Sequence, residues 1–169
     1  MKICQASISE NGTIDGKAGD QTGKELNEST LKTVNWDYAL RFKNKDLRLA
    51  LVIIIRAAVN NDFIGYSQKS RNSLWTKAKK YMSLGKIIEK CNCDCSSLVT
   101  VCVLMAYYAI YKKWLFVPGK NLPTTRSLRK TLMSTGIFEE IKLPRLANLE
   151  VGDILLNEGK HTCVVSKID

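Results

Sequence analysis

Proline and histidine are scarce in this sequence, and a long run of apolar residues is absent. Only three prolines and one histidine occur among its 169 residues. The apolar run from Leu49 to Ile55 ends at Arg56, whereas a membrane-spanning helix needs about 20 such residues. No repeat, linker or low-complexity segment is visible either. These absences favour one folded domain over residues 1–169 without a helical membrane span.

A secretory signal is also missing from the first residues, which lack a charged segment followed by an apolar one. A chain of this length can bury a core without covalent cross-links. We therefore predict that the protein is made in the cytoplasm without a signal peptide and that its cysteines are mostly free thiols. The six cysteines are Cys4, Cys91, Cys93, Cys95, Cys102 and Cys163.

Positive charge is in clear excess. Twenty-six lysines and arginines face 16 acidic residues, which gives a net charge of +10. Such an excess attracts polyanions over long range. Nucleic acid, anionic lipid and the anionic bacterial wall all meet this description, and charge alone does not choose among them.

The spacing of apolar residues predicts helices first and an antiparallel sheet afterwards, which is an α+β pattern. An edge strand is expected at 2–9, a turn at 10–12 and a glycine-rich loop over 11–23. Helices are expected from Asp46, as the capping residue, to 60–62, from Asn72 or Ser73 to about Met82, over 96–114, and over 127–133 before Gly136. Strands are expected at 138–143, 152–156 and 161–167, with a hairpin loop at 157–160.

Cys95 stands where a polar segment runs into an apolar helix. A thiolate at the start of a helix is favoured by the helix dipole and by unpaired backbone amides, which predicts a lowered pKa. The same amides can hold the oxyanion of an acyl-transfer intermediate. Cys95 is therefore a candidate nucleophile, although a buried cysteine that only fills space is the common alternative. Cys102 and Cys163 fit that alternative better.

A nucleophilic cysteine needs a base, and His161 is the only histidine. If a Cys–His dyad exists, His161 must be its second member. The alternative is a histidine at a hairpin edge with no chemical role.

Zinc offers a different interpretation of the same residues. Cys91, Cys93, Cys95 and His161 would form a Cys₃His set, and a basic module with such a site could bind nucleic acid. The alternating Cys-x-Cys-x-Cys spacing differs from the usual Cys-x₂₋₄-Cys spacing, so this stays the alternative function.

Several motifs resemble those of the NlpC-like and CHAP-like cell-wall peptidases. The segment Asp94–Val99 resembles their nucleophile motif, and Val151–Leu156 followed by His161–Val165 resembles the two strands that end with the histidine. Further segments resemble the catalytic domains of phage endolysins from Gram-positive hosts, in the same order along the chain. These are Ala6–Gly12, Gly19–Glu25, Trp36–Arg41, Ile64–Gln68, Arg71–Leu74 and Thr125–Arg126.

The resemblance implies a papain-like fold, with N-terminal helices packed on a small antiparallel sheet and the nucleophile at a helix N-terminus. It implies that Cys95 attacks an amide of the peptidoglycan stem peptide, or the bond between lactyl-muramic acid and L-alanine. The enzyme would be an endopeptidase or an N-acetylmuramoyl-L-alanine amidase. His161 would deprotonate the thiol and protonate the leaving amine, and the amide of Cys95 would contribute to the oxyanion hole.

Four more residues receive substrate-binding roles from the resemblance. Asp94 and Ser96 flank the cysteine, and Asp94 would bind a cationic amine by charge. Asp20 and Gln21 lie in the glycine-rich loop and would border the cleft, with Gln21 as an oxyanion donor. Ordinary turn chemistry explains Asp20 and Gln21 equally well.

Such families often orient the histidine with a third polar residue on the strand that follows it. This chain stops at Asp169, so the expected third member is Asp169 or an acidic or amide residue of the N-terminal segment, unless the dyad acts alone. No metal or cofactor is expected. We expect a monomer without a separate wall-binding domain that acts on the wall after release. Its expected partners are peptidoglycan and anionic wall polymers, not nucleic acid.

Overall fold

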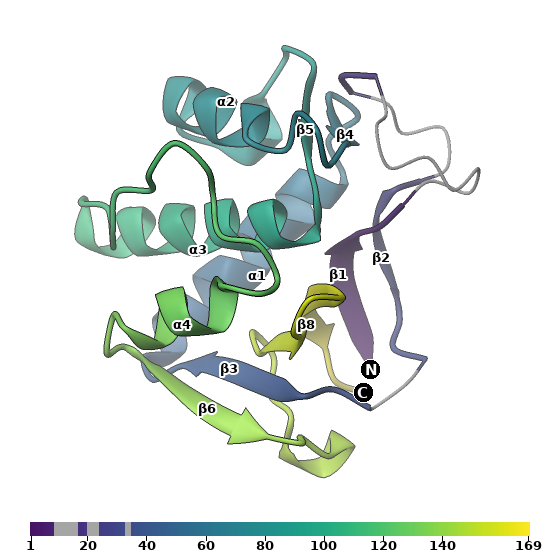
Figure 1. Cartoon of the computed structure of the whole chain (residues 1–169), viewed down its shortest axis with the longest axis vertical. Coiled ribbons are helices and arrows are strands. Elements are labelled where there is room, and N and C mark those ends of the chain that lie inside the picture. Colours follow the sequence, from purple (N-terminus) through teal and green to yellow (C-terminus); the bar gives the residue numbers. More distant parts are fainter. Residues whose placement is uncertain (9–16, 20–23, 33–34) are drawn as a thin grey trace.

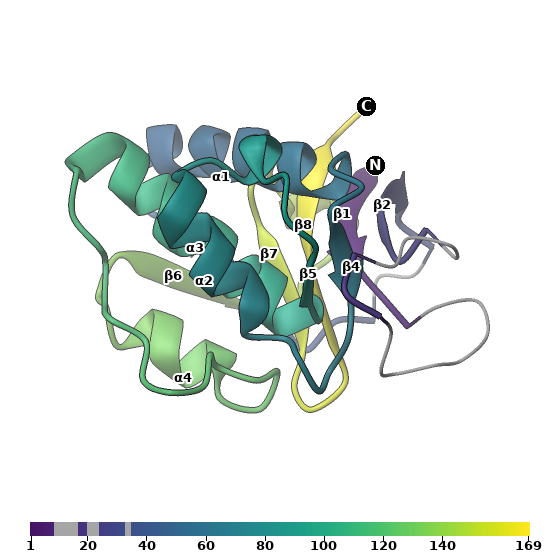
Figure 2. The same cartoon turned by 90° about the horizontal axis from the view of Figure 1, so that it is seen from above.

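A computed structural model of the chain describes residues 1–8, 17–19, 24–32 and 35–169. Figures 1 and 2 show an α+β fold in which helices pack beside a twisted antiparallel sheet. The turn predicted at 10–12 and most of the predicted loop at 11–23 lie outside the described residues.

The sheet has six strands in the order β2-β1-β8-β7-β3-β6, and every neighbouring pair is antiparallel. Its strands are β1 (Lys2–Ala6), β2 (Leu26–Thr30), β3 (Tyr38–Phe42), β6 (Phe138–Lys142), β7 (Ile154–Asn157) and β8 (His161–Lys167). The predicted hairpin of β7 and β8 is confirmed, with Asn157 paired to His161. A short parallel pair, β4 (Ile64–Tyr66) and β5 (Cys91–Cys93), lies outside this sheet.

Four α-helices complete the described fold. They are α1 (Lys45–Val59), α2 (Ser73–Tyr81), α3 (Cys95–Tyr111) and α4 (Leu128–Met133), and two short 3₁₀ turns occur at Leu84–Lys86 and Leu146–Asn148. The predicted cap of α1 was wrong by two residues. Asn44, not Asp46, is the capping residue, because its side-chain oxygen accepts the backbone amides of Asp46 and Leu47.

The predicted order of helices first and sheet afterwards is also wrong. Three strands of the sheet precede α1 in the chain, and the other three follow α4. The α-helices therefore lie between sheet strands in the sequence and are not N-terminal to the sheet. β3 escaped prediction because its last four residues are all buried, which removes the alternation that identifies a strand with one exposed face. Arg41 is tolerated there because it pairs with the fully buried Asp153, at 2.7 Å from Nε to Oδ1.

The sheet is covered on both faces, and β8 shows the alternation plainly. Val164 belongs to the main core with α1 and α3, whereas Cys163 and Val165 belong to a smaller cluster with Ile3 and Trp36. Successive strand residues point to opposite faces, so His161 shares the second face with Cys163. All six cysteines are buried, and all six are free thiols.

No helix among the described residues is long and apolar enough to cross a membrane.

Candidate active site

Cys95 is the first residue of α3 and is separated from the strand β5 only by Asp94. Asp94 caps the helix through a reciprocal pair of hydrogen bonds with Ser97, each 2.8 Å long. Neither bond uses the backbone amide of Cys95. The local sequence thus begins a helix and places the Cys95 thiol at its N-terminus, where the first backbone amides have no partner within the helix.

The Cys95 sulfur is largely enclosed, because the residue is only 9% exposed. The backbone amides of Thr162 and Ser96 favour the thiolate and so lower its pKa. Burial, and then the nearby Asp94 carboxylate, nevertheless raise the pKa of Cys95 to about 11. The predicted lowering of this pKa is therefore wrong, since the cost of burying a thiolate exceeds the gain from the amides.

A cavity of about 560 Å³, here called the cleft, lies in front of this thiol. Cys95 and His161 both line it, and the backbone amide of Thr162, next to His161, is one of the two amides that lower the pKa of Cys95. The described contacts include no direct hydrogen bond between the thiol and the imidazole. The cleft is lined by Ser7, Ile8, Tyr66, Gln68, Asp94, Cys95, Ser96, Thr124, Thr125, Gly159, Lys160 and His161.

His161 begins β8, at the turn that follows β7. Its Nε2 atom lies 2.8 Å from Oε1 of Gln5, a residue of β1. The Trp36 ring lies near it, with the ring centroids 6.1 Å apart. Burial lowers the pKa of His161 from its usual value of 6.5, so the imidazole is neutral at pH 7.

Gln5 is part of a chain of hydrogen bonds that fixes which imidazole nitrogen carries the proton. Asn27 Nδ2 donates to the backbone carbonyl of Lys24 at 2.8 Å, so Asn27 Oδ1 is left to accept from Gln5 Nε2 at 3.4 Å. Gln5 Nε2 also donates to Ser29 Oγ at 3.3 Å. The carbonyl oxygen of Gln5 therefore faces His161, which puts the proton on Nε2 and leaves Nδ1 free to act as a base.

Sequence reasoning did not name Gln5. It foresaw only an acidic or amide residue of the N-terminal segment or Asp169 as a third member. Asp169 instead binds the N-terminal amine of Met1 at 3.0 Å. Gln5 reaches His161 only because β1 and β8 are neighbours, and no local pattern reveals that pairing.

Asp94 and Ser96 line the cleft, but both are engaged with Arg71. Arg71 Nε donates to Asp94 Oδ2 at 2.6 Å, and Arg71 Nη2 donates to Ser96 Oγ at 3.0 Å. The other oxygen of Asp94 accepts from the amide of Ser97 and from the Ser96 hydroxyl. Asp94 therefore has its charge neutralised within the protein, which leaves little of it for a cationic amine.

Arg71 also holds one wall of the cleft. Its Nη1 donates to the carbonyl of Leu122 at 2.7 Å and its Nη2 to that of Pro123 at 2.6 Å. Thr124 and Thr125, the next residues, line the cleft. One buried guanidinium thus ties the cap of the cysteine helix to this wall.

Two residues with predicted roles, Asp20 and Gln21, lie outside the described part of the chain. Tyr66 and Gln68 line the cleft instead, and neither was assigned a role from sequence. Gln68 Nε2 donates to the Tyr66 hydroxyl at 3.1 Å. Burial, with the nearby Cys95 and Asp94 groups, raises the pKa of Tyr66 to about 12, so the phenol keeps its proton.

The zinc alternative gains no support from the described residues, which contain no group of three or more His, Cys, Asp or Glu side chains placed to hold a metal. Cys93 is fully buried, and its thiol donates to the carbonyl of Gly65 at 3.6 Å. Cys102 and Cys163 are fully buried in the two apolar clusters, as their sequence context predicted.

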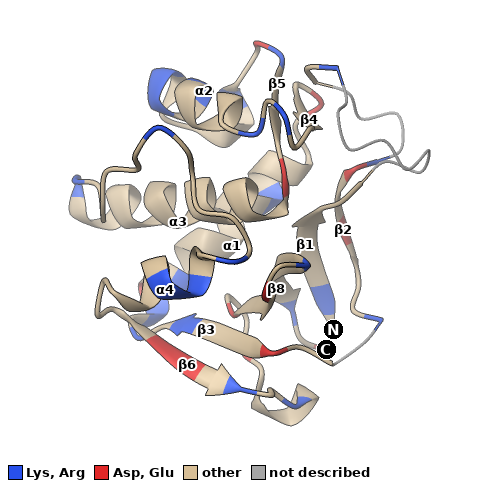
Figure 3. Cartoon of the chain, viewed as in Figure 1, with Lys and Arg blue, Asp and Glu red and all other residues tan. Residues whose placement is uncertain are grey.

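Positive charge is spread over several elements. Figure 3 shows lysines and arginines on α2, α4, β3 and the loops, while β6 carries acidic residues.

A comparison with protein-family models decides the family. The model of the endolysin-like domain matches residues 3–168, nearly the whole chain. The chain belongs to the endolysin-like domain family. No curated protein and no solved structure matches it. Membership indicates a hydrolase that lyses the cell wall by acting on peptidoglycan, and it agrees with the resemblance to phage endolysins.

Proposed function

We propose that this endolysin-like domain is a cysteine-dependent peptidoglycan hydrolase of papain-like design, with Cys95 as nucleophile and His161 as base. The observation that carries the proposal is that Cys95 and His161 line the same cleft. The target is an amide bond of the wall. An endopeptidase and an N-acetylmuramoyl-L-alanine amidase use the same chemistry and differ only in which amide enters the cleft.

In the resting protein the Cys95 thiol and the His161 imidazole are both uncharged. Burial raises the pKa of Cys95 to about 11 and lowers that of His161. Both changes disfavour a preformed thiolate–imidazolium pair, so the thiol loses its proton as the substrate is attacked rather than before. Nδ1 of His161 is the acceptor because Nε2 is engaged with Gln5.

Acyl transfer then proceeds in two halves. The Cys95 sulfur attacks the amide carbon while its proton passes to His161, and an oxyanion forms. The C–N bond breaks, the amine leaves with the proton from His161, and a thioester remains on Cys95. Water, deprotonated by His161, attacks the thioester, which releases the carboxylic acid and restores the thiol.

The oxyanion needs donors near the sulfur. The backbone amide of Cys95 stands at the head of α3, outside the capping bonds of Asp94 and Ser97. The Tyr66 hydroxyl is the second donor that we propose, because it lines the cleft, keeps its proton and accepts from Gln68. Gln21, to which the resemblance gave this role, lies outside the described residues.

Gln5 and Asn27 serve as positioning residues in this proposal. They hold the imidazole with its unprotonated nitrogen available for the thiol. Asp94, Ser96 and Arg71 position the sulfur and the cleft wall, which revises the substrate-binding roles of Asp94 and Ser96 to supporting ones.

The decisive test compares Cys95→Ala with Cys102→Ala on purified Gram-positive cell walls. Cys102 is a buried thiol of the same helix that does not line the cleft, so its removal controls for loss of a sulfur. We expect turbidity to fall with the native protein and with Cys102→Ala, and Cys95→Ala to lose at least about a thousandfold in rate. Mass analysis of the fragments names the bond. Lysis by Cys95→Ala at the native rate would eliminate the mechanism.

A further inference from the structure

A second cavity lies behind the base. This cavity, here called the groove, has a volume of about 470 Å³, within the range of ligand sites. It is lined by Ile3, Gln5, Lys24, Asn27, Ser29, Thr30, Leu31, Lys32 and Trp36. Gln5 lines the groove and hydrogen-bonds to His161, which lines the cleft. The two cavities are therefore neighbours, separated by this pair of side chains.

The charge in the groove has one sign. Lys24 and Lys32 are both exposed, and no carboxylate is among the described residues that line it. Glu28, on the same strand β2, does not line it and instead accepts from Arg56 and Ser166. Glu28 therefore points away from the groove, to the opposite face of the strand. The lysines leave the groove attractive to an anion.

The rest of the lining combines hydrogen-bonding and apolar groups. Asn27, Ser29 and Thr30 offer amide and hydroxyl groups, whereas Ile3 and Trp36 offer apolar surface. A ligand that matches this mixture carries hydroxyl or amide groups, C–H faces and negative charge. Saccharides with carboxylate substituents have this composition, whereas a purely apolar ligand would leave the polar lining unsatisfied.

We propose that the groove binds the glycan strand of peptidoglycan together with a carboxylate of an attached stem peptide, while the scissile amide occupies the cleft. The inference rests on the proposed function for the position of the scissile bond. The Trp36 ring, 6.1 Å from the imidazole ring, places the groove directly beside the base. A polymer that lies at Cys95 and continues past His161 enters the groove next, so the groove acts as an extended subsite.

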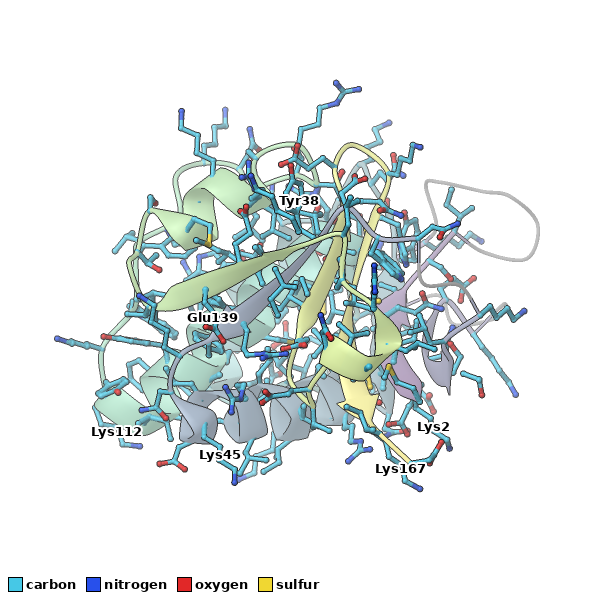
Figure 4. All side chains as sticks on the ribbon, turned by 90° about the horizontal axis from the view of Figure 1, so that it is seen from below. Lys2, Tyr38, Lys45, Lys112, Glu139 and Lys167 are labelled. Carbon is cyan, nitrogen blue, oxygen red and sulfur yellow. The ribbon has the colours of Figure 1, made fainter. Side chains whose placement is uncertain are left out.

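The test measures binding, so it does not depend on turnover. In a Cys95→Ala background, Lys24→Gln/Lys32→Gln is compared with Lys45→Gln/Lys113→Gln by co-sedimentation with cell walls. The control pair removes the same charge from two exposed lysines that do not line the groove, one at the start of α1 and one just after α3. Figure 4 shows Lys45 and Lys112, the neighbour of Lys113, toward one side of the molecule and Lys2 of β1, the strand next to β2, toward the other. The walls are used both intact and stripped of covalently bound phosphate polymers, because those polymers are also anionic and rich in hydroxyl groups.

We expect the groove variant to bind stripped walls about fivefold more weakly than the control pair, the scale of two exposed charge contacts. Equal affinities for the two variants would overturn the proposal. A difference seen on intact walls and lost on stripped walls would overturn the glycan assignment, since phosphate polymers would then be the ligand. In proteins that retain Cys95, the rate of its alkylation by iodoacetamide should be the same for both variants. A changed rate would show that the groove variant disturbs the cleft, and would also count against the proposal.

Failure of the proposed function gives a different result. In that case the native protein leaves walls intact, whatever the affinities of the Cys95→Ala variants. Weaker binding by the groove variant would still identify the groove as a wall-binding surface.

Discussion

The two partners of the proposed dyad are held in different ways. On the cysteine side, Arg71 makes charge-assisted bonds of 2.6 to 3.0 Å to the cap of α3 and to the wall of the cleft. On the histidine side, neutral amides make bonds of 2.8 to 3.4 Å. The ionic side contributes to the stability of the fold. The neutral side orients a base without adding a charge that would change its pKa.

The largest expected effect comes from removing the Arg71 guanidinium, which breaks the ionic contacts on the cysteine side. Arg71→Met leaves the Asp94 carboxylate buried without its partner, which costs about 3 kcal/mol of unfolding free energy. Urea denaturation followed by circular dichroism measures the loss, and lysis should fall with it because the cap and the cleft wall both lose their support. A loss below about 1 kcal/mol would mean that the ion pair does not anchor this side.

Removing the Gln5 amide, on the histidine side, should affect activity more than stability. Gln5→Leu removes the acceptor of His161 Nε2, so the ring loses its orientation and kcat/KM should fall by about a hundredfold. Stability should fall by only about 1 kcal/mol. Because His161 is the only histidine, ¹⁵N NMR reports its tautomer without assignment, and the Nε2–H form should lose population. An unchanged tautomer would contradict the role given to Gln5.

The smallest effect is a displaced pH profile. The pKa of His161 is lowered by burial, so the acid limb of kcat/KM in the native protein should lie below pH 6.5. Gln5→Glu places a carboxylate beside the ring, which favours the imidazolium and should move that limb up by about one unit. A titration of the single imidazole by NMR measures the same shift directly. A limb that moves down, or does not move, would show that residue 5 does not contact the base.

Local pattern was enough to single out the two residues of the proposed dyad. A polar segment before an apolar helix indicated Cys95, and His161 followed because it is the only histidine in the sequence. The last three strands and all four α-helices of the described residues were predicted within a few residues, because the signals for them are local in the sequence.

Features that depend on distant pairing could not be predicted. Gln5 meets His161 through the β1–β8 pair, and Asp94 meets Arg71 from a loop 23 residues earlier. Sequence alone offered Asp94 as a free charge for substrate, since it does not show which cation neutralises it. The pKa of Cys95 was predicted in the wrong direction because the enclosure of the thiol, not its place at the helix start, dominates.

The N- and C-termini lie together, away from the cleft. Met1 and Asp169 form an ion pair at the start of β1 and the end of β8, and Figure 4 shows Lys2 and Lys167 close together there. Ser7 and His161, at the opposite ends of these two strands, line the cleft. A few added residues could therefore join the termini to give a circular permutant. A targeting module fused to either end would leave from this same corner, with the entrance for substrate unobstructed.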